Sequence, residues 1–326
     1  MKIFYKIKNY ISIIICLVLV LTLFSSCSSD NNDKDTSKLS IVTTIFPTYD
    51  FARAVASDTA DITMLINPGV ESHSYEPTPS DIIKIQSADA FIYTGPDMEN
   101  WAEEILSSIN TQKVKIINLS EGIDLLKPML DGEHAHDKDI SSSDEQTHAH
   151  EYDPHIWTSP INAIKMVQEI ETALNEIDPD NSSIYTKNAD DYISQLNELD
   201  KKFKDIVANG ADRELIFSGR FALTYFAAQY GLKCDSAYDS CSTETEPSVA
   251  SITRLINEIK ENNIPVIYYE ELIDPKVGRS IAEQTGAELM LFHTCHNISL
   301  DDFNAGKTYI DLMNNNAIAL QAGLKK

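Results

Sequence analysis

The sequence predicts an α/β protein with two lobes, each containing a mostly parallel sheet flanked by helices, joined by one long helix. Short apolar runs alternate with segments of helical periodicity from residue 39 onward. This alternation occurs twice, and 326 residues suffice for two hydrophobic cores. The expected limits are 39–177 for the first lobe, 178–210 for the linking helix and 211–326 for the second lobe.

The N-terminus has the pattern of a secretory signal peptide, which we place at residues 1–26. Three lysines precede an apolar run that is too short to span a membrane comfortably. Cys27 follows two serines, as in a bacterial lipobox, so lipidation of Cys27 and an extracytoplasmic, membrane-anchored location are expected. Ordinary secretion with cleavage nearby and a retained signal anchor are the alternatives. Residues 27–38 are polar and predict a tether.

The first lobe is expected to alternate strands and helices, as repeated βα units do. A turn is predicted at Asn67-Pro68-Gly69, directly after the second strand. The strands are expected at 39–46, 61–66, 88–95 and 113–119, and the helices at 47–57, 77–88, 98–109 and from about 159.

The linking segment 178–210 has apolar residues at helical spacing along its length. Asp178 or Asp180 can cap its start and Gly210 can end it. In the second lobe, strands are expected at 214–218, 232–237, 264–269 and 287–292, and helices at 221–231, 248–263, 275–286 and 308–324.

Charge and motifs exclude several classes of protein. The formal net charge is −24 and no basic patch is present, which disfavours nucleic-acid binding. Phosphate-binding glycine loops, a GxSxG elbow and an HExxH motif are absent. The common hydrolase and zinc-protease signatures are therefore missing.

All eight histidines lie in three clusters, which is the main indication of function. Imidazole is a common neutral ligand of zinc, so this distribution suggests metal handling. The clusters comprise His73 after the predicted turn, the group His134, His136, His148, His150 and His155, and the pair His293 and His296.

Three of these histidines, His73, His155 and His293, follow predicted strands. Ligands of open parallel sheets bind beyond the carboxyl ends of strands, so a site between the lobes is expected. Ile156 and Trp157 can pack beneath His155, and Asp153 can accept a hydrogen bond from it. A solvated loop histidine at position 73 and a plain structural helix cap at position 155 are the alternatives.

The other histidines lie in the loop 131–151 and beside Cys295. Residues 131–151 contain almost no apolar side chains, so we expect a mobile loop whose histidines collect metal weakly, or an idle solvated insertion. On an extended segment His293 and Cys295 would share a face and His296 would point away. Cys241 is another possible ligand, and a disulfide between Cys241 and Cys295 is left open.

The motifs NPGVESHSYEPTPSDI, ADAFIYTG, DPHIWTSP, TEPS and TYIDLMNNNAIAL, with an acidic His-rich loop, occur in this order along nearly all of the chain after the tether. In this it resembles the zinc/manganese-binding lipoproteins of metal ABC importers, the cluster A-I solute-binding protein family (ZnuA/TroA-like). The resemblance implies metal ligation by His73 and His155. It also implies a two-lobed fold with a long helical backbone.

The second lobe departs from that family. A ligand histidine usually follows the strand here, in a sequence like FSH, but this chain has Gly219 and Arg220. The family's acidic fourth ligand aligns with His293, so His293 is the ligand that we expect from the second lobe. Cys241, His296 or a water could complete the ligand set.

The resemblance implies capture of a divalent transition metal and delivery to an ABC permease by a lipid-anchored monomer. A nitrogen-rich ligand set favours Zn²⁺, with Mn²⁺ as the alternative. A surface adhesin without a transport role is the competing hypothesis. A zinc hydrolase is a third, for which Glu270 is the only candidate base, and no enzymatic activity is expected.

Overall fold

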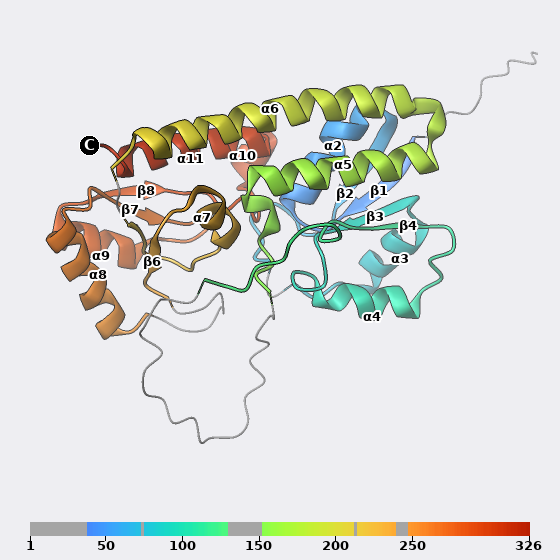
Figure 1. Cartoon of the computed structure of the whole chain (residues 1–326). Coiled ribbons are helices and arrows are strands. Elements are labelled where there is room, and N and C mark those ends of the chain that lie inside the picture. Colours follow the sequence, from blue (N-terminus) through green and yellow to red (C-terminus); the bar gives the residue numbers. More distant parts are fainter. Residues whose placement is uncertain (1–37, 73–74, 130–151, 212–213, 239–246) are drawn as a thin grey trace, which may run out of the picture. The chain divides into compact units, whose positions relative to one another are not determined.

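The computed structural model describes residues 38–72, 75–129, 152–211, 214–238 and 247–326, and Lys38–Lys326 form one compact unit. The predicted fold class is confirmed, because two parallel four-stranded sheets are flanked by helices (Figure 1). Cys27 and the loop 131–151 lie outside the described residues, as do His73 and Cys241. The lobe limits 39–177, 178–210 and 211–326 stay a prediction.

The first sheet has the strand order β2-β1-β3-β4, with every neighbouring pair parallel. Its central residues Ile41 and Phe91 are fully buried, as expected of strands covered on both faces. The strands are β1 (Leu39–Thr43), β2 (Ala60–Met64), β3 (Ala90–Tyr93) and β4 (Lys115–Asn118). The helices before the linker are α2 (Phe46–Ala56), α3 (Pro79–Ser87), α4 (Asn100–Ser108) and α5 (Pro160–Ile177), with short 3-10 turns at Ser57–Thr59 and Ile156–Thr158.

The second sheet repeats this arrangement with the order β6-β5-β7-β8, again wholly parallel. Its strands are β5 (Leu215–Phe217), β6 (Cys234–Ser236), β7 (Val266–Tyr269) and β8 (Glu288–Leu291). The helices are α7 (Thr224–Tyr230), α8 (Val249–Asn262), α9 (Lys276–Thr285), α10 (Leu300–Asn304) and α11 (Tyr309–Gly323).

The long helix α6 (Ser182–Asn209) follows a 3-10 turn at Pro179–Asn181 and has 28 residues, about 40 Å at 1.5 Å per residue. It packs against α2 and α5 of the first half and against α7 and α11 of the second (Figure 1). Buried Tyr185, Leu196 and Phe203 carry these contacts at helical spacing. One rigid element is therefore shared by both halves.

Most element ends differ by a few residues from the sequence prediction, and two elements differ more clearly. The apolar run expected as a strand at 39–46 divides, because β1 ends at Thr43 and α2 begins at Phe46 with Pro47 in its first turn. Helix α10 was not predicted, since its five residues are too few to show periodicity. No helix among the described residues is long and apolar enough to cross a membrane.

Candidate metal site

His155 is held rigidly directly before the 3-10 turn Ile156–Thr158. Its side chain is fully buried, and both its backbone N–H and its ring Nδ1 contact Asp153 Oδ1, at 2.9 and 2.8 Å. The carboxylate therefore fixes the proton on Nδ1 and leaves the lone pair on Nε2, the arrangement that metal-binding histidines use. The hydrogen bond from His155 to Asp153 that was expected from the sequence is therefore present.

Asp153 is itself bound by the second half of the chain. Thr224 Oγ1 donates to Asp153 Oδ2 at 2.6 Å, and the Tyr225 hydroxyl donates to the Asp153 carbonyl at 2.9 Å. Burial alone would raise the pKa of Asp153, but attraction to His155 and the hydrogen bonds from His155 and Thr224 outweigh it and lower the pKa. Helix α7 thus orients His155 through Asp153.

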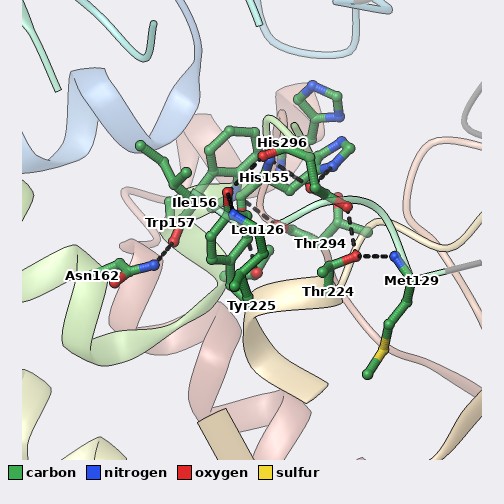
Figure 2. Close-up of polar contacts among 12 residues, drawn as sticks. Leu126, Met129, His155, Ile156, Trp157, Asn162, Thr224, Tyr225, Thr294 and His296 are labelled. Carbon is green, nitrogen blue, oxygen red and sulfur yellow. Dashed lines mark hydrogen bonds and ion pairs between the residues drawn. The ribbon is translucent and has the colours of Figure 1, made fainter. Parts of the chain in front are cut away.

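His296 approaches His155 from the second half. The two ring centroids lie 5.2 Å apart at an interplanar angle of 88°, and the His296 centroid is 5.3 Å from that of Trp157 (Figure 2). The Trp157 indole N–H donates to the Thr294 carbonyl at 2.9 Å, joining the two loops directly. Two imidazoles from loops in different halves of the chain therefore lie next to each other.

The backbone around His296 is fixed by one carboxylate. Glu271 accepts hydrogen bonds from Thr294 N–H at 2.8 Å and from Thr294 Oγ1 at 2.6 Å. The same hydroxyl accepts the His296 N–H at 3.3 Å. Both oxygens of Glu271 are used in holding this loop.

His293 lies behind the His155–His296 pair in a buried backbone network. Its N–H donates to Asn316 Oδ1, its carbonyl accepts from Asn316 Nδ2, and its Nδ1 accepts the Cys295 N–H at 2.9 Å. A neutral ring that accepts at Nδ1 carries its proton on Nε2. In this tautomer neither ring nitrogen offers a lone pair to a metal.

Cys295 is buried at a positive φ of 60°, and Cys295 and Cys234 are both free thiols. Burial and the nearby negative charge of Glu271 raise the pKa of Cys295 well above its usual value. A buried thiol of this kind is a poor zinc ligand, because zinc binds the thiolate.

Asn297, next to His296, clamps the loop that follows β2. Its Nδ2 donates to the carbonyls of Asn67 and Val70, at 2.9 and 2.6 Å. The Gly69 N–H donates to the Ile298 carbonyl at 2.8 Å. The predicted turn at 67–69 therefore joins the two halves immediately before position 73.

A cavity of about 110 Å³ lies beside His296 and is lined from both halves. Its wall carries one cation and several carboxylates, in contrast to the imidazole pair. The polar and charged residues of this wall include Glu71, Arg220, Glu270, Glu271, Thr294 and His296.

Of the residues predicted as ligands, the structure describes His155, His293 and His296 and brings His155 and His296 together. Within the described ranges, no group of three or more His, Cys, Asp or Glu side chains is placed to hold a metal ion. The two remaining candidates, His73 and Cys241, and the loop residues His134, His136, His148 and His150 lie outside those ranges. Sequence reasoning missed the hydrogen bonds of Asn297 and the Trp157–Thr294 bond, because each of them joins segments that lie far apart in the sequence.

Comparisons with known proteins agree on one family. The family model for the zinc-uptake complex component A, periplasmic, matches residues 41–323. The high-affinity zinc uptake system protein ZnuA of Bacillus subtilis (strain 168) is 35% identical over 98% of this chain and 98% of that protein. The Zn(II)-bound ZnuA-like domain of Streptococcus pneumoniae AdcA has a TM-score of 0.74 and 32% identity, covering 89% of this chain and 100% of that one. The laminin binding protein Lmb of Streptococcus agalactiae, described as bifunctional with adhesin and metal transporting activity, has a TM-score of 0.73 and 26% identity over 88% and 100%.

Proposed function

The chain belongs to the zinc-uptake complex component A family, and from this premise we propose that it captures Zn²⁺ outside the cytoplasm and delivers it to an ABC permease. Lipid attachment through Cys27 would keep it at the cell membrane, and we propose that it acts as a monomer. Its role is binding and transfer without chemical turnover. A broad esterase and phosphatase screen with measurable turnover would contradict that last statement.

The observation that carries this proposal is the meeting of His155 and His296 at 5.2 Å. We propose that both rings bind zinc directly, with His73 and Cys241 completing the shell. A set of nitrogen and sulfur donors favours zinc over manganese, which prefers oxygen ligands. His293 supports the His296 loop from behind and does not bind the ion.

The His-rich loop 131–151 has a separate, accessory role in this proposal. Its histidines His134, His136, His148 and His150 collect metal weakly near the site and are dispensable for tight binding. Deleting residues 134–150 is expected to leave the zinc dissociation constant nearly unchanged, whereas His73→Ala is expected to abolish tight binding.

Equilibrium dialysis of the purified chain with elemental analysis tests the function. We expect one tightly bound zinc per chain, with loss of that ion in His155→Ala and in His296→Ala. Binding should weaken as pH falls, because a protonated imidazolium must lose one of its two ring protons before it can bind a metal. A wild-type chain without tight, stoichiometric zinc or manganese would refute metal delivery.

A second candidate is adhesion, favoured by the likeness to the laminin-binding protein. An adhesive surface would act independently of the metal site. Binding to immobilised laminin that persists in His155→Ala would support adhesion, and no binding above that of an unrelated acidic protein would exclude it.

A further inference from the structure

Arg220 stands where the resemblance expects a ligand histidine, and its surroundings give this substitution a physical reason. Its guanidinium Nη1 lies 3.8 Å from Glu71 Oε2, and its side chain is only 20% exposed. Its backbone N–H donates to the Glu270 carboxylate, which also feels its positive charge. Arg220 therefore engages carboxylates on both sides of the cavity.

Gly219 makes this arrangement possible. A Cβ at position 219 would lie 3.1 Å from Glu270 Oε1 and 3.4 Å from two further Glu270 atoms. Those separations are tighter than ordinary contacts, so a larger residue would push the carboxylate away from Arg220. Gly219 thus leaves room for the Glu270 carboxylate to lie next to Arg220.

Arg220 is the one cation among the described residues that line the cavity. Glu71, Glu270 and Glu271 line it, and Glu271 already holds Thr294 with both oxygens. Burial and repulsion from Glu271 raise the pKa of Glu270 to about 7, while Arg220 opposes that rise. Arg220 acts on two of these carboxylates, Glu71 at 3.8 Å and Glu270 through its charge and its backbone N–H, and partly offsets their negative charge.

Carboxylate oxygens at a cavity wall are the ligands that Ca²⁺, Mg²⁺ and Mn²⁺ prefer. An arginine stays protonated under all ordinary conditions, so it acts as a permanent cation among them. We propose that Arg220 is a specificity-determining residue: by occupying Glu71 and Glu270 it excludes hard, oxygen-preferring cations and leaves the imidazole site to zinc. This proposal rests on the proposed function. It adds that the positive charge of Arg220 repels the wrong metal ions and so selects for zinc.

The test compares metal affinities of the full chain and of Arg220→Met by competition titration with Zn²⁺, Mn²⁺ and Ca²⁺. Removing one repelling charge should raise Mn²⁺ and Ca²⁺ affinity by about tenfold or more and change zinc affinity less. Arg220→Lys keeps the charge and should retain the wild-type preference. Adding Glu270→Gln to Arg220→Met should cancel the gain, because the gained ligand is then lost.

Circular dichroism checks that each variant is folded, and Arg220→Gln replaces Arg220→Met if the latter is not. A folded variant with unchanged Mn²⁺ and Ca²⁺ affinity would overturn the proposal, as would a gain that survives Glu270→Gln. Zinc binding by the wild-type chain is measured in the same series. Its absence would instead refute the proposed function, so the two failures are distinguishable.

Discussion

Replacing Asp153 by asparagine exchanges one carboxylate oxygen for an NH₂ group and removes the negative charge beside His155. The amide oxygen of the new side chain can still accept one hydrogen bond, and its NH₂ group can point toward Thr224 Oγ1, which is able to accept. The fold should therefore tolerate the change. The ring of His155 loses a charged partner at 2.8 Å and with it the electrostatic support for the Nδ1–H tautomer.

The size of the effect follows from the role of such partners. Loss of a hydrogen-bonded carboxylate behind a ligating histidine typically weakens metal binding by about ten- to a hundredfold, or about 1.4 to 2.7 kcal/mol. The full burial of both side chains places Asp153→Asn toward the upper end of this range, because no water can replace the lost charge.

The assay is a competition titration of zinc against a chelator of known affinity, with thermal melts of the metal-free chain. Thr224→Val removes the hydroxyl contact to Asp153 but keeps the His155 bond, so a smaller loss is expected. Asp190→Asn, on the exposed side of α6, is the matched control and should leave zinc binding unchanged. An Asp153→Asn variant with wild-type zinc affinity would refute the claim that His155 binds the metal.

Three further predictions concern loop clamping, pH and packing. Asn297→Asp cannot donate its two hydrogen bonds, so zinc should dissociate about tenfold faster in stopped-flow mixing with a chelator; an unchanged rate would exclude a clamping role. Burial raises the pKa of Glu99 from its ordinary 4.5 to about 7, so the folded chain binds more protons than the unfolded chain above pH 4.5. The free energy of unfolding should fall by up to about 3 kcal/mol between pH 4.5 and 7, and Glu99→Gln should lack this component in urea titrations. Gly323→Ala would place its Cβ against the Tyr268 hydroxyl, well inside contact distance. The free energy of unfolding should fall by about 1–3 kcal/mol in thermal melts. An unaltered melting temperature would mean that α11 can shift to make room.

Much of the fold could be predicted because its cause is local in sequence. Parallel strands such as β3 and β7 are short buried runs between helical segments, and α6 has apolar residues at helical spacing along 28 residues. The exact ends were harder to predict, since the run at 39–46 contains only aliphatic, aromatic and hydroxyl side chains, whether it forms β1 or the start of α2. A segment that is buried on all sides lacks the alternation of apolar and polar residues that would show where a strand ends.

Part of the candidate metal site could likewise be predicted from the sequence, and part could not. Asp153 and His155 belong to one motif, and their contact was predicted from two residues of separation. Alternation along FHTCHN assumed an extended segment, but Cys295 has a positive φ of 60° and breaks that geometry. The sequence therefore could not show that His296, which was expected to point away, faces His155. That outcome depends on Asn297 and on distant Trp157, whose hydrogen bonds join residues more than 130 positions apart.

Direct zinc binding by His155 and His296 is the central proposal. An anomalous difference map from zinc-loaded crystals, recorded at the zinc absorption edge, tests this most directly. We expect one strong peak at about 2.0–2.1 Å from a ring nitrogen of each histidine, with His293 outside the coordination shell. A single peak at the Glu71 and Glu270 carboxylates, or one bound by His293 in place of His296, would contradict the account.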